Sequence, residues 1–333
     1  MPSVSVIITS HSRPNLLPRA VESAQAAGSD VEVVVVDDAS RDETAEVCRH
    51  LKGIRYVRVE RNRKVAGARN VGILNSKGDF LTFLDDDDVR LAGVLDLQVE
   101  ALARAPEAGL IYAQALMADA KGVQTGDFYP SHCPQGDVFW ELLGRNFIPC
   151  GTAVFRRSCL FRTGLLDQSV PGIDDWDMWI RISALYPVMA LEQPALVWRK
   201  SSPASGQGTS NASEMVRCAT RQLRRKWLKL PRAVAAAAAA DALSGKRSEA
   251  RRRFSRNMAA HLVFETARAL GERQFLRAQA NGLAALRLHP WACLSVAASS
   301  STLHFLWESV KGKRSRKVVS ARLTGRRPDE IKR

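Results

Sequence analysis

The sequence predicts an α/β protein with a mostly parallel sheet flanked by helices, followed by a C-terminal helical extension. Near-continuous apolar strands alternate with helix-like segments over the first 85 residues, which is typical of a buried parallel sheet. From about Glu214 the chain changes to long stretches rich in Ala and Arg. This change predicts two domains, residues 1–212 and residues 213–333.

Local patterns predict the individual elements. The β-branched and apolar runs predict strands at 4–9, 31–37, 54–60, 80–84 and 109–117, and a strand followed by a turn at 151–158. Apolar residues at helical spacing predict helices at 15–27, 40–51, 66–74, 136–143 and 174–185. The stretch "SRDE" (Ser40–Glu43) predicts a capping box that opens the second helix. We expect residues 201–211 to form a flexible loop.

Charge is divided unevenly along the chain. The 333 residues have a net charge of +15, but residues 215–333 carry 27 Lys and Arg against 7 Asp and Glu. Residues 1–214 carry 22 basic residues against 27 acidic ones. The basic back half indicates an acidic partner, either a membrane surface or nucleic acid, unless its charges are simply solvated helix faces.

Several features indicate a cytoplasmic protein. No run of apolar residues reaches the length of about 18 that a membrane-spanning helix needs. The N-terminal "MPSVSVIITSHSR" predicts a first strand and not a signal peptide. The six cysteines are scattered without a Cys-x-x-Cys motif, so we expect reduced, mostly structural thiols.

Polar clusters follow three of the predicted strands. They are His11-Ser12-Arg13, Asp37-Asp38 and the four aspartates Asp85–Asp88. Because the carboxyl ends of parallel strands meet at one edge, these clusters predict a single ligand crevice. Carboxylates this close repel one another by about 1 kcal/mol per pair even in water. The acid run therefore predicts a bound cation, with a solvated acidic turn or a Ca²⁺ loop as the alternative.

The ordered set "SVIITSHSRPNLL", "VVVVDDASRDET", "GARNVGILNSKGDFLTFLDDDD" and "DDWDMWIRI" resembles a family 2 glycosyltransferase. The resemblance covers roughly residues 3–200. It implies the Rossmann-like GT-A fold, which binds nucleotide sugars, and a reaction that inverts the anomeric centre.

The resemblance also implies roles for the crevice residues. Donor-binding residues would be Thr9, His11, Arg13, Asp37, Asp38, Arg69, Asp85 and Asp86. Mg²⁺ or Mn²⁺ would be held directly by Asp87, with Asp85 directed at the ribose or at the ion through water. If the family motif aligns one residue away from this assignment, Asp86 would take one of these roles. One of Asp37 and Asp38 could instead cap its turn, and Arg69 could be a surface arginine.

Catalytic roles follow from the same resemblance. Asp175 would be the general base, with Asp174 as its rival, unless both acids only complement the helix dipole. Arg199 and Lys200 would form a diphosphate loop. Ser201 stands where the family commonly has a histidine, so we expect no histidine ligand to the metal. Lys64 stands where the family usually has a glycine.

The predicted function is transfer of a sugar from a nucleotide donor, with a UDP-sugar favoured, to a glycan or lipid-linked hydroxyl. The resemblance implies bacterial surface polysaccharide assembly as the context. A sugar nucleotidyltransferase is the alternative, although "TSHSRPN" lacks the Gly-rich loop it would need. A second alternative is a non-catalytic protein that binds nucleotides or nucleic acid.

Two basic stretches with Trp and Leu, residues 223–232 and 303–317, suggest peripheral binding to the inner face of the cytoplasmic membrane. Packing against the catalytic domain is their alternative role. No nucleic acid partner is expected, because the chain lacks a recognition motif.

Overall fold

The computed structural model describes the chain apart from residues 1–2, 120–121, 200–210, 231–239 and 298–333. The chain divides into two compact units. The first comprises Met1–Val138 and Phe147–Gly208, and the second comprises Phe139–Asn146 and Thr209–Arg333. The loop predicted at 201–211 and the basic stretch at 303–317 lie almost entirely outside the described residues.

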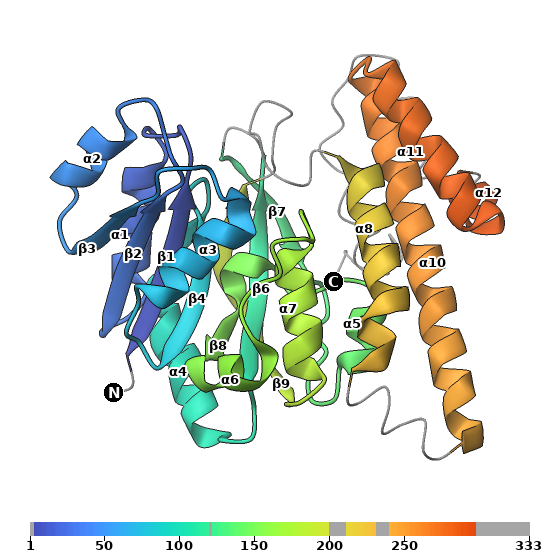
Figure 1. Ribbon diagram of the computed structural model, residues 1–333, viewed down its shortest axis with the longest axis horizontal. Coiled ribbons are helices and arrows are strands. Elements are labelled where there is room, and N and C mark those ends of the chain that lie inside the picture. The colour runs from blue at the N-terminus through green and yellow to red at the C-terminus, as the bar shows by residue number, and fades with distance from the viewer. Residues whose placement is uncertain (1–2, 120–121, 200–210, 231–239, 298–333) are drawn as a thin grey trace. The chain divides into compact units, whose positions relative to one another are not determined.

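The N-terminal part of the first unit forms the predicted parallel sheet. Its strands lie in the order β3-β2-β1-β4, all parallel, as Figure 1 shows. They are β1 (Val4–Ser10), β2 (Val31–Asp37), β3 (Ile54–Arg58) and β4 (Phe80–Asp85). The connecting helices are α1 (Leu17–Ala26), α2 (Thr44–His50) and α3 (Lys64–Leu74). All these elements were predicted, with small shifts at their ends.

The rest of the sheet is mixed. It continues from β4 in the order β8-β6-β9-β5, and β7 pairs with β6. The β6–β9 pair is parallel, whereas the β4–β8, β8–β6, β9–β5 and β6–β7 pairs are antiparallel. These strands are β5 (Val89–Arg90), β6 (Leu110–Ala118), β7 (Gln124–Tyr129), β8 (Val154–Arg156) and β9 (Val188–Arg199). The sequence patterns did not predict β5, β7 or β9.

Short helical segments complete the first unit. They are α4 (Val94–Arg104), η1 (Cys150–Thr152), η2 (Arg157–Cys159), α6 (Leu160–Thr163) and α7 (Asp174–Ser183). Helix α7 was predicted, and α4 was not.

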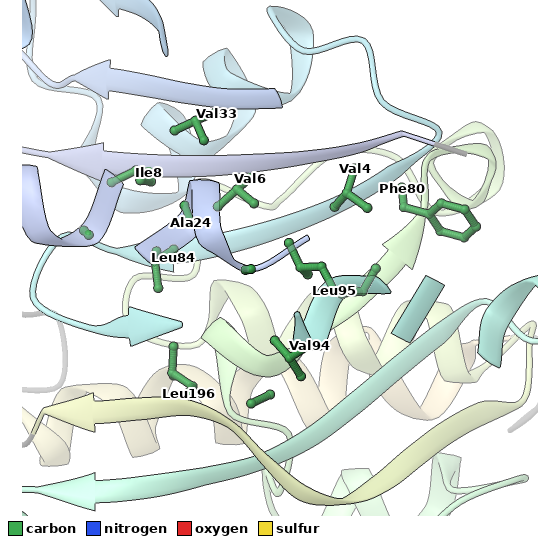
Figure 2. Close-up of a cluster of buried hydrophobic side chains, with 14 of the residues drawn as sticks. Val4, Val6, Ile8, Ala24, Val33, Phe80, Leu84, Val94, Leu95 and Leu196 are labelled. Carbon is green, nitrogen blue, oxygen red and sulfur yellow. The ribbon is translucent and has the colours of Figure 1, made fainter. Parts of the chain in front are cut away.

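The core of the first unit lies on both faces of the sheet. Figure 2 shows Val4, Val6 and Ile8 of β1 in one cluster with residues of α1 and α4. Because side chains alternate along a strand, Ile7 points to the other face, where it lies next to Gly72 of α3. Strand β1 is therefore covered on both sides, which agrees with its continuous apolar sequence.

The predicted capping box is wrong. Helix α2 begins at Thr44, and no side chain caps it from its N-cap residue Glu43. Ser40 instead joins two loops, because its amide donates to Asp37 Oδ1 (2.8 Å) and its hydroxyl accepts from the Ser12 amide (2.9 Å). Ser40 therefore pairs with Asp37 and Ser12 and not with Glu43, the partner that a capping box requires.

The second unit is helical. It contains α5 (Phe139–Gly144), α8 (Ala212–Arg225), η5 (Trp227–Lys229), α10 (Ala240–Gly271), α11 (Phe275–Leu288) and α12 (Pro290–Ala297). The long helix α10 packs against α5, α8, α11 and α12. Trp227 and Leu228 are buried, so this part of the 223–232 stretch does not present its apolar side chains to a membrane, contrary to expectation. Among the described residues, no helix combines the length and apolarity that crossing a bilayer requires.

We predict that Gly72→Ala destabilises the protein. An added Cβ would overlap Ile7 Cγ2, and Ile7 is fully buried and cannot move aside freely. Overpacking of this kind costs about 1–3 kcal/mol. Chemical denaturation should show this loss in the free energy of unfolding.

Gly245→Ala is the matched control. Gly245 also lies within a helix, but an added Cβ there would meet no atom within 4 Å. Its helix propensity should therefore raise stability by up to about 1 kcal/mol. Equal stability changes for the two variants would contradict the packing explanation.

Candidate functional site

The three polar clusters meet at the carboxyl edge of the sheet, as predicted. Ser10, the last residue of β1, donates its hydroxyl to Asp86 Oδ2 (2.7 Å), and Arg13 Nη1 donates to Asp86 Oδ1 (2.8 Å). His11 Nδ1 donates to the carbonyl of Asp38 after β2 (2.7 Å). Direct contacts therefore connect the ends of β1, β2 and β4.

The acid turn (Asp85–Asp88) contains a group that could share one cation. Asp85, Asp87 and Asp88 each offer a carboxylate oxygen, and these oxygens lie within 4.8 Å of one another. Asp86 is not in the group, because Ser10 and Arg13 engage its two oxygens. Three hard oxygen donors fit Mg²⁺ or Mn²⁺ chemically.

Burial changes the acidity of the turn. It raises the pKa of Asp87 to about 6, with further contributions from the charges of Asp85 and Asp86. Burial also raises the pKa of Asp88 well above its usual range, and Asp85 adds to this effect. Buried like charges thus favour proton uptake by the turn, which a bound cation would oppose.

Two arginines approach the turn from distant parts of the chain. Arg13 Nη1 and Arg199 Nη2 each lie 3.7 Å from Asp87 Oδ2. The Arg199 amide also donates to Asp88 Oδ1 (2.8 Å), which fixes the end of β9 against the turn. Lys200, the other member of the predicted diphosphate loop, lies outside the described residues.

Arg69 connects the acid turn to helix α7. Its Nη2 lies 2.8 Å from Asp85 Oδ1, and its Nη1 lies 2.9 Å from Asp174 Oδ2. The side chain is only 5% exposed, and its guanidinium lies over the Phe83 ring. Arg69 is therefore not a surface arginine, and its planar fork suits this double pairing.

The acidic pair at the start of α7 is asymmetric. Asp174 is buried and held by Arg69, whereas Asp175 is half-buried and accepts from the Trp176 amide (2.7 Å). Burial, reinforced by the charge of Asp174, raises the pKa of Asp175 to about 7. A carboxyl group with a pKa near neutrality is well suited to accept a proton in general base catalysis.

Asp37 and Asp38 are both buried but have different hydrogen-bond partners. The fully buried Asp37 accepts from the Ser40 amide (2.8 Å) and from the Tyr56 hydroxyl (2.8 Å), so it stabilises its own turn. Asp38 accepts from the Arg63 amide (2.7 Å), and burial raises its pKa. This geometry matches the alternative in which one of the two acids caps the turn.

Three residues around the crevice have left-handed backbone conformations. The φ angles are 53° at Ser12, 61° at Ala39 and 61° at Lys64. Such conformations cost about 1 kcal/mol or more outside glycine and cluster at functional sites. The conformation of Lys64 explains why glycine suits this position in the resembling family.

Sequence reasoning missed two residues of this region. Ser10 fell between the strand predicted at 4–9 and the polar cluster that starts at His11, and no role was predicted for it, although its position directly before the cluster was a usable signal. Arg90 is buried below the turn, where Nη2 donates to Thr82 Oγ1 (2.5 Å) and Nη1 approaches Gln98 Oε1 (3.4 Å). No local pattern distinguished Arg90 from a solvent-facing strand residue.

Comparison with known sequences relates part of this chain to glycosyltransferases. Residues 5–161 match the family model of Glycosyl transferase family 2. An uncharacterized glycosyltransferase of Haemophilus influenzae is 34% identical over 180 residues, which cover 54% of this chain and 61% of the relative. The chain thus matches less than two thirds of that relative's length. The Escherichia coli UDP-Glc:alpha-D-GlcNAc-diphosphoundecaprenol beta-1,3-glucosyltransferase WfaP is 28% identical over 187 residues, covering 55% of this chain and 70% of WfaP.

Solved structures share the fold. The Staphylococcus aureus TarS 1–349 complex with UDP superposes with a TM-score of 0.55 and 16% identity, covering 93% of this chain and 87% of TarS 1–349. The Pyrobaculum calidifontis mannosyltransferase PcManGT, in complex with GDP-Man and Mn²⁺, gives 0.52 and 21%, covering 87% of each chain. These likenesses confirm the predicted GT-A fold. The family match covers residues 5–161, in which three of the four quoted motifs lie, and it agrees with the resemblance to family 2 glycosyltransferases.

Proposed function

We propose that this chain is a metal-dependent, inverting glycosyltransferase that moves a sugar from a nucleotide-diphosphate donor to an acceptor hydroxyl. The observation that carries the proposal is the Arg69 bridge, which joins the acid turn at Asp85 to the acidic pair at Asp174. A group suited to cation binding and a carboxyl suited to proton transfer therefore belong to one connected site.

The acid turn would hold the metal. Asp85, Asp87 and Asp88 are the proposed ligands for Mg²⁺ or Mn²⁺, because their oxygens already lie close enough to share an ion. A bound divalent cation would neutralise charge on the departing diphosphate. Asp86 would act indirectly by holding Arg13 beside the turn.

The chain's own residues would supply the remaining functions. Asp175 would accept the proton of the acceptor hydroxyl, and Arg69 would position Asp174 beside it. Arg13 and Arg199 already lie beside Asp87, where a diphosphate would come within reach of their guanidinium groups. Base and ribose contacts would come from Thr9, His11 and Asp38.

The donor and acceptor follow by analogy with relatives. WfaP is named as acting with UDP-Glc on a diphosphoundecaprenol-linked sugar, and TarS binds UDP in its structure. We therefore propose a UDP-sugar donor and a glycan or lipid-linked acceptor, in bacterial surface polysaccharide biosynthesis. The enzyme would then work in the cytoplasm, peripherally at the inner face of the membrane.

The general base can be tested with Asp175→Asn. The amide cannot accept the proton, so turnover should fall by about 10²–10⁴-fold. Binding of the UDP-sugar, measured by calorimetry, should persist. Asp30→Asn, at an exposed acid on the opposite edge of the sheet, is the control and should leave both unchanged. Full activity in Asp175→Asn would refute the mechanism.

The pH profile gives a second test. A base must be ionised to work, so kcat/KM should rise with pH through about 7, the pKa of Asp175, and level off above it. The residual activity of Asp175→Asn should lack this rise. A wild-type profile that falls between pH 6 and 8 would have the wrong sign for a general base.

Metal dependence can be tested on the acid turn. EDTA should abolish transfer, and Mn²⁺ with UDP should raise the melting temperature of the wild-type chain. Asp87→Asn should lose most of this metal-induced shift, because Asp87 lies in the proposed ligand group. Asp86→Asn, from the same turn but outside the group, should retain more of it. The reverse order would assign the ion to Asp86.

A further inference from the structure

Helix α11 of the second unit is apolar on two opposite sides. Its buried stripe consists of Ala278, Asn281 and Ala285, and the helix packs on α10. At 100° per residue, Leu276 and Leu283 lie on the side opposite this stripe. Leu276 is 84% exposed and Leu283 is 46% exposed. A surface helix normally carries polar residues on the side opposite the core. Exposed leucines on that side of α11 therefore indicate a contact with a further molecule.

Exposed apolar residues extend beyond these two leucines. The others on α11 and α12 are Phe275, Leu286, Trp291 and Leu294, and Trp291 is 76% exposed. We call these six residues the apolar face. Apolar exposure concentrated on neighbouring helices marks an interaction site for protein or membrane more often than chance.

Charge distinguishes between the partners. The sequence from Arg273 to Ala297 contains three arginines and no acidic residue. Two of them, Arg273 and Arg287, are exposed, whereas Arg277 contacts Gln274 and Glu265. A symmetric contact with a second copy would bring two exposed arginines from each copy together, and the acid nearest to them in sequence is the single exposed Glu272 beside Arg273. An anionic surface complements both the apolar face and its arginines.

We propose that the apolar face docks on an anionic lipid bilayer. Trp291, Leu276 and Leu283 would enter the interfacial layer, with Arg273 and Arg287 at the headgroups. This inference rests on the proposed function in one respect: a lipid-linked acceptor gives the docking its purpose. It also moves the membrane contact from the Trp227 stretch, whose apolar residues are buried, to α11 and α12.

Co-sedimentation with vesicles tests the docking on the full-length chain. The wild-type chain should bind vesicles of phosphatidylglycerol and phosphatidylcholine in equal parts, and bind pure phosphatidylcholine at least tenfold more weakly. Leu276→Glu with Leu283→Glu should weaken binding to the anionic vesicles at least tenfold. Arg287→Ala should weaken it about fivefold at low salt and less at high salt.

Leu74→Glu is the matched control. Leu74 is a comparably exposed helical leucine in the first unit, and its replacement should leave vesicle binding unchanged. Circular dichroism should show all the variants folded, since each replaced leucine is exposed. Donor hydrolysis in the absence of vesicles should also be unchanged, because none of these residues belongs to the crevice.

Two results would overturn the proposal. One is vesicle binding that survives Leu276→Glu with Leu283→Glu, which would assign the contact to another part of the chain. The other is a wild-type dimer that the double variant converts to a monomer, without vesicle binding by either. Vesicle binding without any sugar transfer would leave the docking in place and refute the proposed function alone.

Discussion

Repulsion among the buried carboxylates of the acid turn is the constraint around which the crevice is arranged. Asp86, Asp87 and Asp88 are all buried at the end of β4, where water cannot solvate three adjacent charges. The structure meets this cost in two ways. Arginines pair with Asp85 and Asp86, and burial raises the pKa values of Asp87 and Asp88, so these two groups take up protons more readily than a solvated carboxyl does. A divalent cation would offset the same repulsion.

The arginines that balance the turn come from three separate elements. Arg13 follows β1, Arg69 lies within α3, and Arg199 ends β9. The sheet order brings these elements to one edge, because β1 and β4 are neighbours and β9 pairs with β5 directly after the turn. The mixed half of the sheet therefore matters to the site, since it delivers the backbone amide that binds Asp88.

The sequence was informative where local pattern and tertiary environment agree. The buried strand 31–37 has continuous apolar residues, and its predicted bounds match β2. Strand β9 escaped prediction because Glu192, Gln193 and Pro194 interrupt its apolar pattern, where its pairing with β6 also shifts register. The pattern could not reveal that Asp37 turns to Tyr56, or that Trp227 is buried, because those environments depend on residues distant in sequence.

The same reasoning applies within the site. A run of four aspartates predicts a bound cation, but the sequence alone does not show which three of them bring their carboxylate oxygens close together. Asp86 is outside this group because Ser10 and Arg13 donate hydrogen bonds to its two carboxylate oxygens.

The Arg69 bridge also bears on how the site is assembled during synthesis. Arg69 and Asp174 are separated by 105 positions, and Asp85 is only 16 positions from Arg69. Closing the longer loop costs more chain entropy, and such distant contacts tend to form late in folding. On the ribosome, the acid turn emerges well before Asp174 and Asp175. The nascent chain would therefore acquire the carboxylates of the acid turn before Asp174 and Asp175, and Arg69 could join the two groups only after α7 had been made.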